Sequence, residues 1–298
     1  MDLKEPLSFP DQVKRLQEHN LIIKDPKSAE KFLQNNNYYR FTGYALQYRI
    51  QPGNSDLKDG VSFEQVAAIY RFDEEMRNLL RKWIELLEVY FRTQIAYVFS
   101  MRKCLLPPHD QHYDTQKNYY LKADAKNVFD DFERQKKYYY DTLVYQHHQK
   151  KYNDKYPLWV IVEMLSFSDL SKLYGCMYSS DQEAIAQACG VRAVTLKNHL
   201  HCLSVLRNKC AHAARLYNIS FRPSVQLPPS IRRKNAAIQG NTFFAYLLVL
   251  TRRLPSDEQK KEFIQEICDL VRKYTSLVDL SLIGFPIDYR AVLLSNRA

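Results

Sequence analysis

Glycine is scarce: the chain has 7 glycines in 298 residues, whereas an average usage of about 7% would give roughly 21. Helical folds tolerate this scarcity, but many nucleotide-binding folds depend on glycine-rich loops that wrap phosphate groups. The sequence contains neither G-x-x-x-x-G-K-[ST] nor G-x-G-x-x-G, the spacings that P-loop ATPases and dinucleotide-binding enzymes require. Nucleotide-cofactor chemistry of those kinds is therefore not expected.

Cysteine pairs and long apolar runs are also missing. The six cysteines form no C-x-x-C motif, so we expect no zinc site, no redox pair and a reduced, cytoplasmic protein. The longest strong apolar run, residues 243–250, is too short to cross a bilayer before Arg252 and Arg253 follow it. No apolar signal core lies near the N-terminus. We expect no membrane span, no metal and no cofactor.

Acidic side chains are absent from residues 191–255, although the whole chain carries 33 of them. Eleven basic residues lie in this acid-free segment: Arg192, Lys197, Arg207, Lys209, Arg215, Arg222, Arg232, Arg233, Lys234, Arg252 and Arg253. Without these eleven, 32 of the 43 basic residues remain to balance the 33 acids, so the segment accounts for the net charge of +10. A positive surface attracts phosphodiester backbones, and 22 tyrosines offer faces for base stacking. We expect a nucleic-acid partner; the alternatives are acids brought from elsewhere in the fold, or an acidic protein.

Helical periodicity is the main secondary-structure signal. Residues 62–65 form a capping box, and apolar residues recur at helical spacing from Val66 to about Cys104. This pattern predicts one long helix that the Pro107-Pro108 pair stops.

Further helices are expected along the rest of the chain. They are a buried helix after Pro157, a helix capped by Ser168 or Asp169, a helix at about Thr195–Tyr217, a buried helix at residues 241–254, and an amphipathic helix through Tyr274 that starts at a capping box in residues 256–259. Three prolines leave residues 218–240 as a basic loop. We therefore expect an all-α bundle over residues 61–298, with a small N-terminal helical appendage over residues 1–60.

A candidate constellation lies inside the acid-free segment, where Arg207, Asn208 and His212 follow one another closely. On a helix, Asn208 and His212 lie about 40° apart, whereas Arg207 and His212 lie about 140° apart, so one chain presents a divergent pair. Two such helices related by a two-fold axis would place two arginines and two histidines around one groove. We therefore expect a homodimer. The alternative is that Arg207 and His212 are ordinary helix-surface or cap residues.

Such a groove suits transesterification of RNA, in which the 2′-hydroxyl attacks the adjacent phosphorus. A histidine can take and give a proton near neutral pH, and an arginine can hold the phosphate and offset its developing charge. No carboxylate near the motif offers to hold Mg²⁺, so the predicted reaction needs no metal. DNA lacks the 2′-hydroxyl and could not be cut in this way.

The segment Arg207–Asn218 (RNKCAHAARLYN) resembles the signature of Abi-like proteins, the AbiD/AbiF group of bacterial abortive-infection factors within the HEPN superfamily of helical RNases. Three more segments resemble the family in the same order: Asn37–Tyr44, Ile69–Asp73 with Glu88 and Arg92 on the same helix, and Pro157–Ser171. The resemblance covers nearly the whole chain. It implies an HEPN-like all-helical fold and a metal-independent RNase site formed across a homodimer, used against phage or as a toxin.

The resemblance also implies roles for single residues. Arg207 would bind the phosphate, His212 would be the catalytic histidine, and Asn208 would position them. Family members are thought to associate with a small noncoding RNA, which suits the basic surface. Two departures stand out: Ala213 replaces a frequent second histidine, which bears on the level of activity, and Ser168 replaces a frequent glycine, which is a mild change.

RNA contacts are assigned to a wider set of residues: Lys209, Arg215, Tyr217, Arg222, Arg232, Arg233, Lys234, Tyr38, Tyr39 and Arg40. The alternative for Tyr38 and Tyr39 is a role in packing. The alternative for the basic cluster at residues 232–234 is a solvated loop that contacts no RNA. Glu88 and Arg92 are expected to form an intrahelical pair. Both tryptophans, Trp83 and Trp159, are expected in the core.

Two other functions stay open at this point. One is a protein that binds a structured noncoding RNA with weak or no cleavage, and the other is a helical scaffold that binds an acidic protein.

Overall fold

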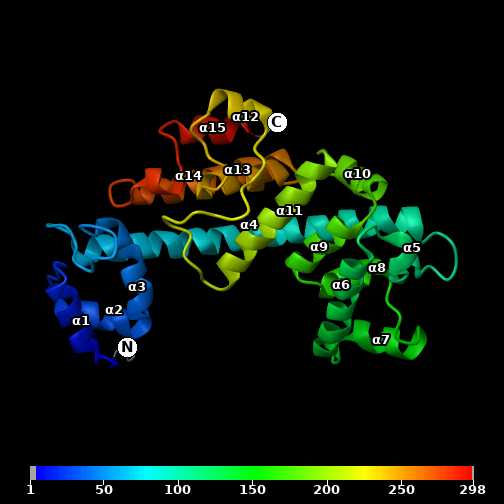
Figure 1. The fold of residues 1–298 in the computed structure, drawn as a ribbon, viewed down its shortest axis with the longest axis horizontal. Coiled ribbons are helices and arrows are strands. Elements are labelled where there is room, and N and C mark those ends of the chain that lie inside the picture. The colour runs from blue at the N-terminus through cyan, green and yellow to red at the C-terminus, as the bar shows by residue number, and fades with distance from the viewer. Residues whose placement is uncertain (1–4, 297–298) are drawn as a thin grey trace.

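The computed structural model describes residues 5–296 and is built from helices (Figure 1). The α-helices are α1 (Phe9–Glu18), α2 (Pro26–Asn35), α3 (Tyr38–Ala45), α4 (Phe63–Lys103), α5 (Thr115–Asn118), α6 (Lys122–Gln135), α7 (Leu143–Lys151), α8 (Leu158–Met164), α9 (Phe167–Cys176), α10 (Ser179–Ala188), α11 (Ala193–Ala211), α12 (Pro229–Lys234), α13 (Phe243–Arg253), α14 (Asp257–Tyr274) and α15 (Tyr289–Ser295). Short 3-10 turns lie at Leu46–Tyr48, Gln111–Tyr113, Lys136–Tyr139 and Leu280–Ile283. Extended pairing within residues 5–296 is limited to isolated bridges, so the all-α fold class is confirmed.

Helix α4 is the axis of the molecule, and it runs through the picture with other helices on both sides (Figure 1). The capping box predicted at its start is present: the Gln65 backbone N–H donates to Ser62 Oγ over 3.3 Å, and the Ser62 backbone N–H donates to Gln65 Oε1 over 2.9 Å. The helix continues to Lys103 and is capped by Cys104, as the apolar spacing predicted. The second predicted capping box also forms, at Ser256.

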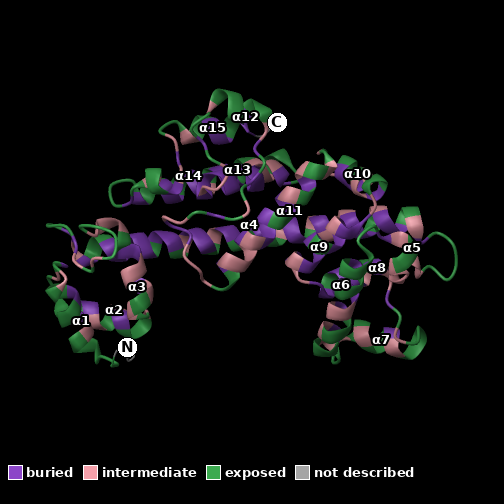
Figure 2. Cartoon of the chain, in the orientation of Figure 1, coloured by how far each residue is buried: buried purple, intermediate pink, exposed green. Residues whose placement is uncertain are grey.

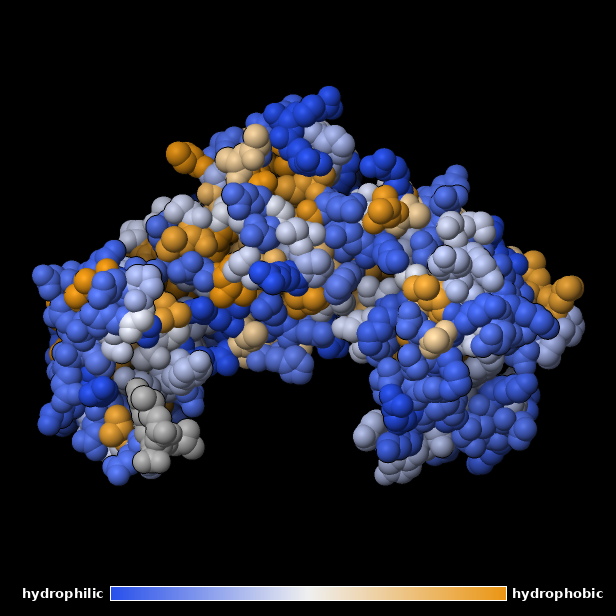
Figure 3. Space-filling model, in the orientation of Figure 1, coloured by the Kyte–Doolittle hydropathy of each residue, from blue (hydrophilic) through white to orange (hydrophobic). Residues whose placement is uncertain are grey.

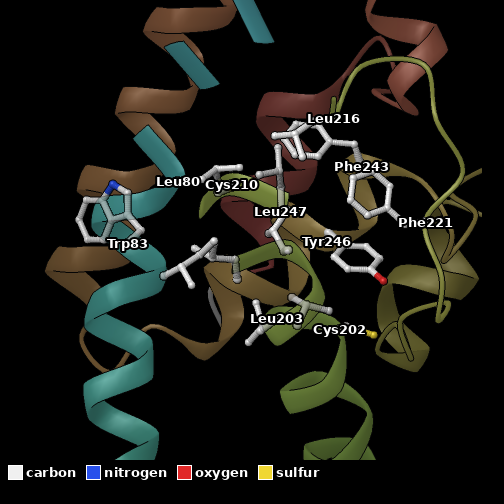
Figure 4. Packing of buried hydrophobic residues seen from close by; sticks show 14 of the residues in the cluster. Leu80, Trp83, Cys202, Leu203, Cys210, Leu216, Phe221, Phe243, Tyr246 and Leu247 are labelled. Carbon is white, nitrogen blue, oxygen red and sulfur yellow. The ribbon is translucent and has the colours of Figure 1, made fainter. Parts of the chain in front are cut away.

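The core that positions the candidate site lies where α4, α11, α13 and α14 pack together. In Figure 4 the side chains of Leu80 on α4, Cys210 on α11 and Leu247 on α13 point toward one another. Figure 2 shows α13 largely in the colour of buried residues, as predicted for the apolar stretch after residue 241. Trp83 is buried as expected, and its indole nitrogen donates to a Glu266 carboxylate oxygen over 2.6 Å.

Three local expectations were wrong. Ser166, rather than Ser168 or Asp169, caps α9, because its Oγ accepts the Asp169 backbone N–H over 3.1 Å. Trp159 is 56% exposed, because the seven-residue helix α8 has room for one buried face only. The basic cluster at residues 232–234 lies in the last turn of α12, and proline at the first helical position favours that short helix.

Residues 5–60 form the compact group α1–α3 at one end of α4 (Figure 1). Phe41 of α3 stacks on Phe63 at the start of α4, with ring centroids 4.6 Å apart. Backbone hydrogen bonds join Ile22 to Val61 and Phe63, at 2.9 Å each. A boundary at residue 60 remains a prediction, since α3 packs directly on α4.

The molecule is arched. Figure 3 shows a hollow between the group α1–α3 and the group that contains α6 and α7. The C-terminal end of α11 extends past α4 toward this hollow in the same view (Figure 1). Within residues 5–296, no helix is both long and apolar enough to cross a membrane.

Candidate functional site

Helix α11 ends at Ala211, six residues earlier than predicted, so His212 lies on the cap and not on the helix face. Ala213 has a left-handed backbone (φ 50°) and its N–H donates to the Cys210 carbonyl over 3.3 Å. The Ala214 N–H donates to the Lys209 carbonyl over 2.8 Å, which completes a Schellman motif. The expected angular positions on one helix therefore do not apply to His212. A non-glycine residue in this conformation holds local strain of about 1 kcal/mol.

A buried carboxylate holds the chain that leaves α11. Asp73 on α4 accepts the backbone N–H of Tyr217 at 2.9 Å and that of Leu216 at 3.1 Å. It also accepts the Tyr44 hydroxyl at 2.6 Å and forms an ion pair with Arg77. Although burial opposes the charge, Asp73 and Tyr44 raise the pKa of Arg77. This carboxylate competes with helix continuation for the two N–H groups, which is why the helix prediction through Tyr217 failed.

Arg207 is held from the other side. Its Nε lies 3.3 Å from Glu88 Oε2, and Glu88 Oε1 lies 2.7 Å from Arg92 Nη2. Arg92 also donates to the Leu165 carbonyl over 3.0 Å, so the expected Glu88–Arg92 pair is confirmed and is part of a longer chain of contacts. The Arg207 side chain remains 39% exposed, whereas Glu88 is buried. A buried anion thus orients a guanidinium whose outer face is free to meet another group.

Two more contacts fix the last turn of α11. Asn208 Nδ2 donates to Ser168 Oγ over 3.0 Å. The serine that replaces the frequent glycine of the family therefore forms a hydrogen bond with the motif. Arg81 on α4 donates through Nε and Nη2 to the Cys210 carbonyl, at 3.1 and 2.8 Å. Burial raises the pKa of the Cys210 thiol to about 12, so this thiol stays protonated at neutral pH.

Two cavities lie on either side of the motif. One, of about 370 Å³, is lined by Arg207 and Ala211 together with Arg81, Glu88 and Arg92. We call it the Arg207 cleft.

The other cavity, of about 830 Å³, joins the motif to α3 and is called the α3 groove. Its lining combines Tyr39 and Arg40 with Arg49, Ala213 and Arg215. It has three arginines and no carboxylate in its lining. His212 is exposed and lines neither cavity, but its chain neighbours Ala211 and Ala213 line the cleft and the groove respectively.

The predicted RNA-binding residues occupy different places. Tyr39 is 86% exposed and Tyr38 is partly buried against the core. Arg215 donates to the Gly43 carbonyl and lies over the Tyr44 ring. Lys209 Nζ lies 5.5 Å from the centre of the Phe221 ring.

The other predicted contacts lie apart from these cavities. Arg222, Arg232, Arg233 and Lys234 are exposed and line neither the Arg207 cleft nor the α3 groove. Tyr217 is 1% exposed, and its hydroxyl donates to the Asp279 carbonyl over 2.9 Å. A base cannot reach this ring, so Tyr217 is withdrawn as an RNA contact and is a packing residue.

Few cations of the acid-free segment are neutralised within the chain. Among the eleven, Arg207 is the one that forms an ion pair within residues 5–296. The alternative in which acids from elsewhere in the fold pair with these cations was therefore wrong for the rest. No cluster of three or more histidine, cysteine or acidic side chains that could hold a metal ion occurs in the part of the chain that the structure describes.

Some site residues had no signal in the sequence. Asp73 lies in a segment that resembles the family, but the sequence assigns it no role, and its partner Arg77 has the pattern of an ordinary polar residue on a long helix. Arg49 and Arg81 each reach the motif from far away in the chain, and spacing alone cannot reveal such contacts. To predict that Arg81 contacts the motif, one would have to know how α4 packs against α11.

All four segments that suggested a family meet at the end of α11. Tyr44 and Asp73 hold the chain after the motif, and Glu88 with Arg92 links Arg207 to the carbonyl of Leu165. The family model described as Abi-like protein matches residues 31–218, which include all of these positions. Searches of curated proteins and of solved structures gave no match. This chain belongs to the Abi-like protein family.

Proposed function

We propose that the protein is a metal-independent endoribonuclease of the HEPN type that acts in abortive infection, with a site completed across a homodimer. Abi-like proteins are abortive-infection factors, so family membership connects the chain with defence against phage. The observation that carries the proposal is the pairing of a half-exposed Arg207, held by buried Glu88, with an exposed His212 at the same helix end.

In the proposed reaction the 2′-hydroxyl oxygen of a ribose attacks the adjacent phosphorus and the bond to the 5′-oxygen breaks. One His212 takes the proton of the 2′-hydroxyl, and the His212 of a second copy gives a proton to the leaving 5′-oxygen. Arg207 donates to the phosphate oxygens as negative charge builds on them. The products are a 2′,3′-cyclic phosphate and a 5′-hydroxyl.

The proposal needs the second copy, because one chain presents one histidine and the reaction uses a base and an acid. The cap position of His212 supports this arrangement. An exposed side chain at a helix end can approach a symmetry-related copy without the core being disturbed. The α3 groove is the proposed path for the RNA on each side, with Tyr39 as a stacking face and Arg40, Arg49 and Arg215 near the backbone.

The test uses purified protein and total RNA in EDTA, with Arg207→Ala and His212→Ala as variants. His201→Ala is a matched control, because His201 is also exposed on α11 but lies two turns before the motif. We expect cleavage by the wild type and by the control, and none by the two motif variants. Cleavage by the motif variants would point to a contaminant and would contradict the proposal.

A second function has its own support. Ten of the eleven cations in the acid-free segment lack an ion-pair partner within residues 5–296, and Ala213 replaces the frequent second histidine of the motif. Both features suit a protein that binds a structured noncoding RNA and cleaves weakly or not at all. Tight, salt-sensitive RNA binding without cleavage in the same experiment would favour this function.

A further inference from the structure

A third cavity, of about 610 Å³, lies away from the motif, between the first half of α11, the loop that leads into α12, and the end of α13. Four arginines line it: Arg192, Arg232, Arg252 and Arg253. No aspartate or glutamate is among its lining residues. We call it the arginine pocket.

Two lining residues each keep one buried nitrogen without a hydrogen-bond partner. Arg253 is 9% exposed; its Nη1 donates to the Cys189 carbonyl over 3.3 Å, but its Nε has no hydrogen-bond partner. His199 is 1% exposed and its Nδ1 also has none. A buried polar atom without a partner costs about 1–3 kcal/mol, so native proteins rarely keep one without a reason.

The charge of this pocket is not balanced from within the chain. The side chains of Arg192, Arg232 and Arg252 have no hydrogen-bond or ion-pair partner in the range 5–296. Burial lowers the pKa of Arg252 and Arg253, and the two guanidinium groups lower it further for Arg253 by mutual repulsion. The end of a helix favours cations, but this effect is worth at most about 2 kcal/mol and does not supply hydrogen-bond acceptors.

His199 lines the pocket without adding charge to it. Its Nε2 lies 3.0 Å from the Gln226 carbonyl, which can only accept, so Nε2 carries the proton. Burial lowers the pKa of His199 to about 4, so at neutral pH Nδ1 is an acceptor. The charge of the pocket therefore comes from its arginines, which offer guanidinium donors for an anion.

We propose that the arginine pocket binds a phosphate monoester, with the guanidinium groups of Arg192, Arg232 and Arg252 donating to its oxygens. Arginine donates to phosphate oxygens in a fork, which suits a tetrahedral dianion. Apolar side chains of Val225, Leu227 and Ile238 line the same cavity and can cover an attached nucleoside. The phosphate group belongs either to a free nucleotide or to the 5′-end of an RNA chain. The site does not depend on Arg207 or His212.

The first test is calorimetric titration of the full chain with inorganic phosphate, with chloride as the comparison at equal ionic strength. Chloride is a single ion that cannot accept the two parallel donors of a guanidinium fork, so we expect phosphate to bind at least tenfold more tightly. The variants Arg252→Gln and Arg232→Gln should each weaken phosphate binding by tenfold or more. Arg233→Gln is the matched control, because Arg233 is exposed on α12 beside Arg232 but does not line the pocket.

The second test separates the two sources of phosphate. Adenosine monophosphate is compared with a 2′-O-methyl RNA hexamer that carries either a 5′-phosphate or a 5′-hydroxyl, and the methyl groups prevent cleavage. Preference for the phosphorylated hexamer assigns an RNA terminus, and tighter binding of the mononucleotide assigns a free nucleotide. Equal binding of phosphate and chloride, or equal losses in Arg232→Gln and Arg233→Gln, would overturn the proposal. Because no cleavage is measured, failure here leaves the nuclease proposal unaffected.

Discussion

Replacing Asp73 by asparagine tests the contact that holds the chain after the motif. The side chain is 1% exposed, and its partner Arg77 is 3% exposed. An asparagine oxygen can still accept the N–H groups of Leu216 and Tyr217, and Tyr44 can reorient its hydroxyl. The buried guanidinium of Arg77, however, loses its negatively charged partner, because an amide carries no charge. Leaving one member of a buried ion pair alone costs about 3–5 kcal/mol, so we expect Asp73→Asn to lower the free energy of unfolding by that amount.

The matched control is Asp130→Asn on α6. Asp130 pairs with Lys126 at the same spacing of four residues, over 2.6 Å, but the two side chains are 44% and 64% exposed. Exposed pairs of this kind contribute about 0.5 kcal/mol or less. Urea denaturation followed by far-ultraviolet circular dichroism measures both variants. A loss below about 1 kcal/mol in Asp73→Asn, or equal losses in the two variants, would refute the reasoning, since burial is the feature that separates them.

Other expectations follow from the same contacts. Tyr217→Phe removes one buried hydrogen bond; it should lower the unfolding free energy by about 1 kcal/mol and leave RNA affinity in filter binding unchanged, whereas weaker RNA binding would return this tyrosine to the interface. Ala213→Gly relieves a left-handed backbone and should raise the unfolding free energy in urea by up to about 1 kcal/mol. Glu88→Gln removes the anion that orients the motif arginine, so cleavage in EDTA should slow tenfold or more with RNA affinity retained; an unchanged rate would contradict its positioning role. Burial lowers the pKa of His112 and of His199 from 6.5 to about 4. In the unfolded chain these histidines are protonated below pH 6.5, whereas in the folded chain they are protonated only below about pH 4. Each histidine should therefore lower the free energy of unfolding by about 2 kcal/mol at pH 5 relative to pH 7. Thermal unfolding in matched buffers measures this difference.

The sequence predicted the regular parts of the fold well. Apolar spacing and the two capping boxes, at Ser62 and Ser256, depend on residues within a few positions of one another, and the helices that they predicted are present. The end of α11 was predicted poorly because it is decided by Asp73, which lies more than a hundred residues earlier in the chain. A helix pattern continues through Tyr217 in the sequence, and local rules contain no sign of a distant acceptor.

The candidate site was predicted in part for the same reason. Arg207 and His212 are neighbours in the chain, so their motif was visible, and the resemblance of the surrounding segments pointed to a family. The contacts of Arg207 with Glu88, and the groove that joins Arg215 to Tyr39, depend on how α4 and α3 pack against α11. Such long-range packing follows from the whole core and not from any one segment.

The most direct test of the account is the chemistry of the RNA ends that the protein produces in EDTA. A defined oligoribonucleotide, cleaved by the wild type and by His212→Ala, is examined by mass spectrometry of the products. We expect a 2′,3′-cyclic phosphate and a 5′-hydroxyl from the wild type and no cleavage by the variant. A 3′-hydroxyl with a 5′-phosphate, or the same products from His212→Ala, would contradict it.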